Sequence, residues 1–244
     1  MLSSLIDPIL SFVYPTYCLS CGHRVESYSN TPACRTCWHD THIFSESDLL
    51  CSRCGVHYGP RETANDVFCR KCDDHHYDRA FAVGLYEKAL AASVVHLKET
   101  PKVFSNLRRE IGNALTRSLT SGIDLIIPVP LSRRRRHERE FNQAELIAEV
   151  CSEFLRMPAD TMSLQRIRDT PMQRSGMDAK ARAASVEGAF SVTRPKLIES
   201  KNILLVDDVL TSGATASNCA EELQKNGASS VTVFTLARAV LTKL

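Results

Sequence analysis

Two kinds of apolar pattern alternate along the last two thirds of the chain. Short runs that are apolar throughout, such as residues 202–206, are typical of strands buried on both faces of a parallel sheet. Longer stretches with apolar residues three and four positions apart, such as residues 141–157, are typical of helices that bury one face. Together the patterns predict strands at 78–86, 123–130, 202–206 and 230–237, and helices at 89–97, 103–120, 141–157 and 214–226.

This alternation predicts the fold class: an open, mostly parallel α/β sheet with helices on both faces. Ligands of such sheets bind beyond the carboxyl ends of the strands. Gly227 follows the last predicted helix, where glycine commonly ends a helix. Residues 165–182 are polar without a sustained period, and they predict a loop that leads into a short helix. Cys151 and Cys219 occupy apolar positions of two predicted helices, so we expect them in the core.

The other eight cysteines all precede residue 73 and divide the chain. They form four Cys-x-x-Cys pairs, separated by 12, 13 and 14 residues. A tight turn bearing such a pair presents two thiolates at the separation that tetrahedral zinc requires, so two pairs complete one site. The sequence therefore predicts two structural Zn²⁺ ions, held by Cys18, Cys21, Cys34, Cys37, Cys51, Cys54, Cys69 and Cys72.

The assignment of these pairs to sites has two solutions. Glycine follows the first and third pairs, as Gly22 and Gly55, and this repeat favours two consecutive zinc ribbons. A cross-braced arrangement stays open on spacing alone. A disulfide framework would need an oxidising compartment, and no export signal is evident. Five histidines near the pairs offer alternative ligands, which a full set of sulfurs makes unnecessary: His23, His39, His57, His75 and His76.

The distribution of charge supports a division of the chain at residue 78. Residues 1–77 carry 6 basic and 9 acidic side chains, and residues 78–244 carry 24 and 19, so attraction for phosphate is expected in the second part. We therefore expect a double zinc ribbon at 1–77 and the α/β domain at 78–244.

No apolar run approaches the roughly 18 residues of a membrane helix. The apolar segment 1–17 lacks a basic start and is interrupted by Asp7 and Pro8, so we expect a short docking helix and a cytoplasmic protein.

The segment 203–215 carries the strongest chemical signal. A buried strand ends in two carboxylates, Asp207 and Asp208, and small hydroxyl and glycine residues then open a helix. Backbone N–H groups and the helix dipole make such a loop a phosphate cradle, and the carboxylates are suited to the hydroxyls of an attached sugar. This segment resembles the phosphoribosyl-pyrophosphate motif of type I phosphoribosyltransferases. The resemblance assigns the ribose hydroxyls to Asp207 and Asp208, and the 5-phosphate to Thr211, Ser212, Gly213, Ala214 and Thr215.

Two further stretches agree with this resemblance. The first runs from Val129 through four consecutive arginines to Phe141-Asn142-Gln143, where the family has its pyrophosphate loop, and Arg135 and Arg139 match that loop. Arginine grips pyrophosphate bidentately. The second stretch contains Arg168, Thr170 and Gln173 and resembles the flexible loop of amidophosphoribosyltransferases, which closes over the substrate.

The complete order of motifs resembles the ComF family, proteins with a double zinc ribbon and a phosphoribosyltransferase-like domain that are linked to competence and DNA use. The resemblance covers nearly the entire chain. Glu140 stands where the family usually has glycine, and Ser185 replaces a frequent asparagine. Glu140 adds a side chain and a negative charge beside the expected pyrophosphate loop.

Two functions follow as hypotheses. The first is transfer of a phosphoribosyl group, with Asp207 and Asp208 holding the ribose and with Mg²⁺ and arginines neutralising the departing pyrophosphate. The second is a non-catalytic sensor of phosphoribosyl pyrophosphate that handles single-stranded DNA or contacts the competence machinery, to which the basic segment 133–139 would contribute. The sequence fixes neither the acceptor substrate nor the oligomeric state.

Overall fold

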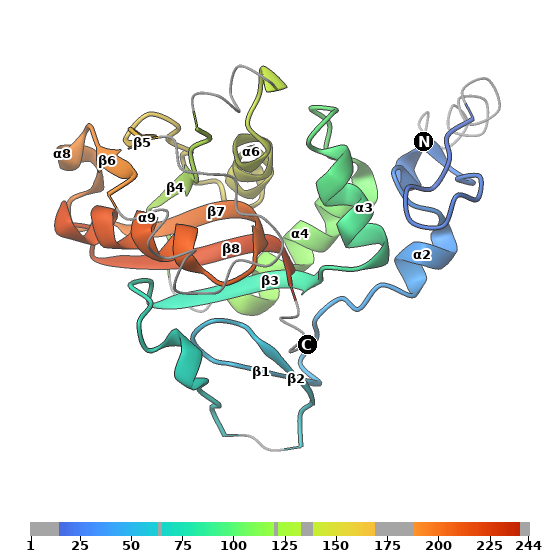
Figure 1. The fold of residues 1–244 in the computed structure, drawn as a ribbon, viewed down its shortest axis with the longest axis horizontal. Helices are drawn as coiled ribbons and strands as arrows, with labels where there is room; N and C mark the ends of the chain where they lie inside the picture. The colour runs from blue at the N-terminus through green and yellow to red at the C-terminus, as the bar shows by residue number, and fades with distance from the viewer. Residues whose placement is uncertain (1–14, 63–64, 120–121, 133–138, 169–187, 240–244) are drawn as a thin grey trace.

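The computed structural model describes residues 15–62, 65–119, 122–132, 139–168 and 188–239. Its main sheet has four parallel strands in the order β3, β8, β7, β4, with β4 uppermost in Figure 1. The strands are β3 (Arg79–Leu85), β8 (Ser230–Arg238), β7 (Asn202–Leu210) and β4 (Leu125–Pro128). The predicted open, parallel sheet is therefore confirmed.

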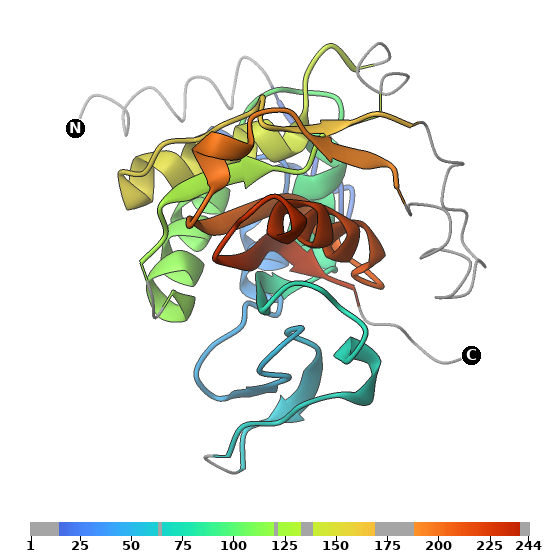
Figure 2. The same ribbon diagram turned by 90° about the vertical axis from the view of Figure 1, so that its left-hand side faces the viewer.

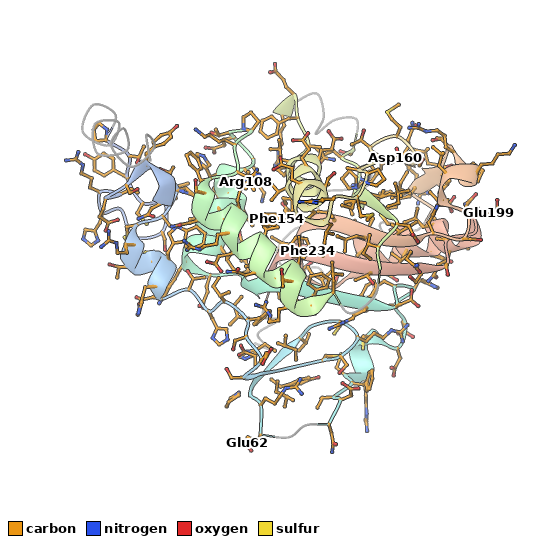
Figure 3. All side chains as sticks on the ribbon, turned by 180° about the vertical axis from the view of Figure 1, so that it is seen from behind. Glu62, Arg108, Phe154, Asp160, Glu199 and Phe234 are labelled. Atoms are coloured by element: carbon orange, nitrogen blue, oxygen red, sulfur yellow. The ribbon has the colours of Figure 1, made fainter. Side chains whose placement is uncertain are left out.

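Helices cover both faces of this sheet, as predicted. Leu204 and Val206 of β7 join the core under α3 (Lys88–His96), α4 (Ser105–Ser118) and α6 (Gln143–Leu155). Ile203 and Leu205 join the opposite core, because side chains alternate along a strand. That second core is covered by α9 (Ala214–Lys225) and by a small antiparallel sheet of β5 (Leu164–Arg166) and β6 (Phe190–Val192). Figure 3 views the molecule from the side of α4.

In the α/β domain, the predicted elements differ from the observed ones in the end of β7 and in three short elements. Strand β7 continues to Leu210 instead of ending at 206, because Val209 and Leu210 still pair with Ala237 and Arg238 of β8. Strands β5 and β6 and the short helix α8 (Pro195–Ile198) are absent from the sequence prediction, and β5 occupies the start of the expected 165–182 loop. Most of that loop, and most of the expected docking helix at 1–17, lies outside the described residues.

The cysteine-rich part forms two small units that pack on different elements. The first contains η1 (Tyr28–Asn30) and α2 (Arg35–His39), and its cysteines share a core with Ala89 and Ala92 of α3. The second contains β1 (Asp48–Leu50), β2 (His57–Pro60) and η2 (Arg70–Cys72), and its cysteines share a core with the α9 face of the sheet. Figure 2 shows the second unit below the sheet. Within the described residues, every helix is too short or too polar to cross a membrane.

The segment joining the two units lies along the outer side of β3. Phe44 donates its N–H to the Val83 carbonyl at 2.9 Å, and Leu85 donates its N–H to the His42 carbonyl at 2.9 Å. Between these hydrogen bonds, Ile43 bridges Gly84 in antiparallel fashion. A Cβ on Gly84 would lie 2.2 Å from the His42 carbonyl oxygen, so only glycine permits this approach.

We expect Gly84→Ala to lower the midpoint of thermal unfolding, at a cost of about 1–3 kcal/mol for forced overpacking. The backbone of the 42–44 segment would have to move, since the clash involves a carbonyl and not a flexible side chain. Gly122→Ala is the matched control, because a Cβ there meets nothing within 4 Å. Differential scanning calorimetry of both variants with zinc bound measures the effect. Equal midpoints for the two variants would show that the 42–44 segment does not pack on β3.

Candidate functional site

The first four-cysteine site is built by two turns that meet in front of α3. Its sulfurs come from Cys18, Cys21, Cys34 and Cys37, and all lie within 4.8 Å of one another. Cys21 is exposed and the other three are buried. The pairing is sequential along the chain, which selects the consecutive-ribbon alternative over the cross-braced one.

The second site has the same plan and is more deeply buried. Its sulfurs, from Cys51, Cys54, Cys69 and Cys72, also lie within 4.8 Å of one another, and all four residues are buried. The Sγ atoms of Cys51 and Cys72 are 3.7 Å apart, and those of Cys54 and Cys69 are 3.4 Å apart. Four sulfurs at about 2.3 Å from one zinc ion would be separated by about 3.8 Å, whereas disulfide sulfurs lie about 2.0 Å apart. The geometry therefore suits zinc and not disulfides.

The thiols within each site differ in acidity. Burial opposes ionisation of Cys18 and Cys51, but backbone N–H groups of their turns donate to the sulfurs, and the pKa of each thiol falls to about 7. Burial raises the pKa of Cys37 to about 12 and that of Cys54 to about 11. Four thiolates at these separations repel one another unless a cation lies between them. The two groups therefore fit structural zinc.

A third group of ligand-type side chains, His42, Asp48 and His57, lies beside the second unit. Both imidazole Nε2 atoms are hydrogen-bonded to Asp48 Oδ1, at 2.7 Å from His42 and 2.9 Å from His57. Asp48 Oδ2 accepts from the N–H and hydroxyl of Ser45 at 2.8 and 3.0 Å. These hydrogen bonds fasten the segment between the two cysteine units to β1 and β2.

The loop after β7, residues 211–215, has the form expected of a phosphate cradle. Gly213 is the N-cap of α9 and has a φ of +82°, a conformation that favours glycine. Thr211, Ser212 and Thr215 are half-buried, while Gly213 and Ala214 are buried. The first N–H groups of a helix lack acceptors within it, so they can bind an anion. At the far end of α9, Gly227 has the predicted left-handed conformation.

The two carboxylates before this loop are both half-buried and differ in setting. They lie inside β7 and not after it, and alternation from Ile203 and Leu205 places Asp207 on the α9 face. Asp207 Oδ1 accepts from the Asp208 N–H at 2.9 Å, and Asp208 Oδ1 accepts from the Val209 N–H at 2.7 Å. Burial raises the pKa of Cys219 in α9, and the nearby charge of Asp207 raises it further.

The expected pyrophosphate loop leaves the sheet next to these carboxylates. Strand β4 runs parallel to β7 with Pro128 opposite Val206, and Val129 donates its N–H to the Val206 carbonyl at 2.8 Å. The residues that follow β4 therefore leave the sheet at the level of Asp207 in β7. The buried Asn142 closes the segment, because its Nδ2 donates to the Val129 carbonyl at 3.0 Å and its Oδ1 caps α6.

The arginines predicted for this loop are only partly within the described structure. Arg139 is half-buried, whereas Arg135 lies outside the described residues. Glu140 has a φ of +61°, a left-handed conformation that favours the glycine usual in the family. Glu140, which replaces that glycine, thus occupies a backbone conformation that residues with a side chain rarely adopt.

The expected closing loop begins and ends on the β5–β6 pair. Arg168 is exposed two residues beyond β5, while Thr170 and Gln173 lie outside the described residues. Strand β6 is tied to α9, since Val192 donates its N–H to Glu222 Oε1 at 3.3 Å. The β5–β6 pair that flanks residues 169–187 is therefore tied to α9, the helix after the 211–215 loop.

Sequence reasoning missed three residues that surround the 211–215 loop: Arg238, His75 and Tyr77. Arg238 is buried at the end of β8, and its Nη1 donates to the Leu210 carbonyl at 2.7 Å and to the Thr211 carbonyl. The signal in the sequence was a single charged residue, Arg238, at the end of an otherwise apolar strand.

The predicted core positions of Cys151 and Cys219 are confirmed: both are fully buried, and burial raises the pKa of both thiols.

Two four-cysteine sites joined to a parallel sheet with this loop define a double-zinc-ribbon, phosphoribosyltransferase-like protein. Residues 9–73 match a family model described as a double zinc ribbon domain. The DNA utilization protein YhgH of Escherichia coli O157:H7 is 32% identical over 203 residues, which cover 78% of this chain and 84% of the relative. The chain belongs to the ComF family, as the order of its motifs predicted.

Two other similarities extend this comparison. Competence protein F of Haemophilus influenzae is 37% identical over 117 residues, covering 48% of this chain and 51% of the relative. Among solved structures, the glutamine phosphoribosylpyrophosphate amidotransferase of B. subtilis, complexed with ADP and GMP, is 19% identical with a TM-score of 0.36. That similarity covers 53% of this chain and 26% of the amidotransferase.

We expect two zinc ions per chain, one lost in Cys34→Ser and one in Cys69→Ser, because each cysteine belongs to a different site. The double variant Cys34→Ser/Cys69→Ser tests the pairing. Sequential sites lose both ions, whereas a cross-braced arrangement that joins the second and fourth pairs would lose one. Metal analysis by mass spectrometry, with Cys151→Ser as the control that keeps both ions, gives the count.

Proposed function

We propose that this protein binds phosphoribosyl pyrophosphate at the carboxyl end of β7 and acts as a phosphoribosyltransferase-type protein in the use of incoming DNA. The observation that carries the proposal is the 211–215 loop, where Gly213 turns the chain from β7 into α9. The first amides of α9, which lack acceptors within the helix, suit the 5-phosphate. Membership of the ComF family and the name of the relative YhgH support the link to DNA utilisation.

Each part of the ligand has a matching group in this proposal. Asp207 and Asp208 accept hydrogen bonds from the ribose hydroxyls. Arg135 and Arg139 bind the pyrophosphate, to which Mg²⁺ would add charge neutralisation. Arg168, Thr170 and Gln173 belong to the segment that closes over the ligand and excludes water. The reducing conditions that keep eight cysteines as zinc ligands agree with a cytoplasmic location.

Transfer of the phosphoribosyl group is the favoured activity. The bond between ribose C1 and the pyrophosphate oxygen breaks with developing positive charge on the sugar, and the acceptor's nucleophile forms the new bond. Groups that hold the departing pyrophosphate more strongly than the intact ligand lower the barrier. The two carboxylates, with different surroundings in β7, stabilise the sugar in this step.

Binding of single-stranded DNA is the second candidate function. Its support is the concentration of arginines at 133–139, together with the names of YhgH and competence protein F. The affinity of a basic segment for a nucleic-acid backbone depends on the summed positive charge, and this affinity falls steeply as the salt concentration rises. In this alternative, the protein is a non-catalytic sensor that binds both single-stranded DNA and phosphoribosyl pyrophosphate.

We expect Asp208→Asn to weaken binding of phosphoribosyl pyrophosphate with Mg²⁺ by about 1–3 kcal/mol, the value of a charge-assisted hydrogen bond. Isothermal titration calorimetry measures the change. Glu62→Gln removes the same charge at the tip of the second cysteine unit (Figure 3) and should bind like the wild type. Equal affinity of Asp208→Asn and the wild type would remove Asp208 from the site.

The arginines separate the two candidate functions. We expect Arg135→Lys to weaken phosphoribosyl-pyrophosphate binding, because lysine lacks the bidentate fork, while leaving DNA binding nearly unchanged. Replacing Arg133, Arg134 and Arg136 by glutamine should lower the salt slope of single-strand binding by about 0.7 per lost contact. Fluorescence anisotropy with a labelled oligonucleotide at several salt concentrations gives the slope. If no variant, nor the wild type, binds the oligonucleotide, this segment has no DNA role.

A further inference from the structure

The second cysteine unit contacts the 211–215 loop directly. The rings of His75 and Tyr77, which follow the last cysteine ligand, are stacked with centroids 4.8 Å apart. A Cβ on Gly213 would lie 2.9 Å from both His75 Nε2 and the Tyr77 hydroxyl oxygen. Next to them, His76 donates its N–H to Ser217 Oγ in α9 at 3.0 Å. The loop therefore rests on residues supplied by the zinc-binding part of the chain.

The second four-cysteine site holds this supporting segment in place. Arg53 lies inside the Cys51-x-x-Cys54 turn, and its side chain donates to the His75 carbonyl at 2.5 Å and to the Tyr77 carbonyl at 3.4 Å. The carbonyl of Arg53 in turn accepts from the Ala80 N–H of β3 at 2.6 Å. The turn that would hold the metal therefore contacts the backbone that carries both rings.

Arg238 lies between the loop and the core that contains the same site. Its guanidinium holds the Leu210 and Thr211 carbonyls, where the loop begins, and only 5% of the residue is exposed. The Leu210 side chain belongs to the buried cluster that also contains Cys54 and Tyr77. A buried guanidinium is costly without a counter-charge. Four thiolates around Zn²⁺ carry a formal charge of about −2 and would supply it.

Two buried polar atoms mark this contact as incompletely satisfied. Among the described residues, the Tyr77 hydroxyl and Arg238 Nε have no hydrogen-bond partner, although both are buried. Tyr77 itself is fully buried, and its hydroxyl is directed at Gly213. Buried polar groups in folded proteins are nearly always hydrogen-bonded, so two unpaired ones beside the proposed phosphate loop suggest that the loop can adopt a second conformation.

We propose that the second four-cysteine site positions the 211–215 loop through Arg238 and Tyr77, so that metal at this site, and not at the first, controls anion binding by the loop. Arg238 and Tyr77 are positioning residues in this scheme. The first site packs against α3 and makes none of these contacts through the residues described. The proposal rests on the proposed function for the identity of the ligand, but not for the coupling itself.

The first test compares Arg238→Met with Arg108→Met in the zinc-loaded, full-length protein. Arg108 lies on α4, on the other side of the sheet (Figure 3), and pairs with Glu153 at the surface. We expect Arg238→Met to keep two zinc ions, and its loop amides at 211–215 to exchange about tenfold faster, the scale of one lost hydrogen bond. Phosphoribosyl-pyrophosphate affinity should fall by a similar factor, and Arg238→Lys should restore part of both. Unchanged exchange in Arg238→Met would overturn the coupling.

The second test removes each metal separately. Cys69→Ser should speed exchange of the 211–215 amides and weaken ligand binding, whereas Cys34→Ser should leave both at the wild-type level. Equal effects of the two variants would overturn the assignment to the second site. Should circular dichroism show that Cys69→Ser is unfolded, the Arg238 comparison decides. If the wild type does not bind phosphoribosyl pyrophosphate, the proposed function fails, while the exchange measurements still decide the coupling.

Discussion

Parallel pairing of β7 with β8 is the interaction on which the other features depend. Its register sets Leu210 opposite Arg238, so the last residue of β8 lies under the point where β7 turns into the 211–215 loop. The same pairing extends β7 beyond the two carboxylates, Asp207 and Asp208. A shift of one residue would move the Asp207 side chain to the other face of the sheet and Arg238 away from the loop. The candidate site therefore depends on strand register before it depends on any side chain.

The zinc sites have a wider structural role than that of small independent ribbons. A short, loop-rich segment buries little apolar surface by itself, and metal coordination usually provides its folding free energy. Here the cysteines of the first site also share a core with α3, and those of the second share one with β7, β8 and α9. Metal binding is thus expected to stabilise the sheet domain together with the cysteine units. The shared core also places the turn of Cys51 and Cys54 close to the start of the 211–215 loop.

Much of this organisation could be predicted from local pattern. The spacing of the cysteine pairs and the repeated glycine identified both sites and favoured their sequential pairing, because metal ligation is encoded by residues close in sequence. Helical spacing likewise identified Cys151 and Cys219 as core residues. The end of β7 was predicted wrongly, since two charged residues resemble a strand terminus, and the neighbouring strand keeps the backbone paired beyond them. The contacts of Arg238 and Tyr77 with the loop could not be predicted, because they depend on tertiary packing: Arg238 reaches the loop from the neighbouring strand, and Tyr77 lies more than 100 residues from Gly213 in sequence. The roles of Arg135, Thr170 and Gln173 remain predictions.

The 42–44 segment has a consequence for how copies of this chain meet one another. It occupies the hydrogen-bonding side of β3, one border of the main sheet. At the other border, the Ile126 N–H of β4 donates to the Pro158 carbonyl, and the Ile126 carbonyl accepts from the Asp160 N–H. In the described residues both borders of the sheet are thus covered by the chain's own backbone. These contacts occupy hydrogen-bonding groups at both borders of the main sheet and so oppose the addition of a strand from another molecule there.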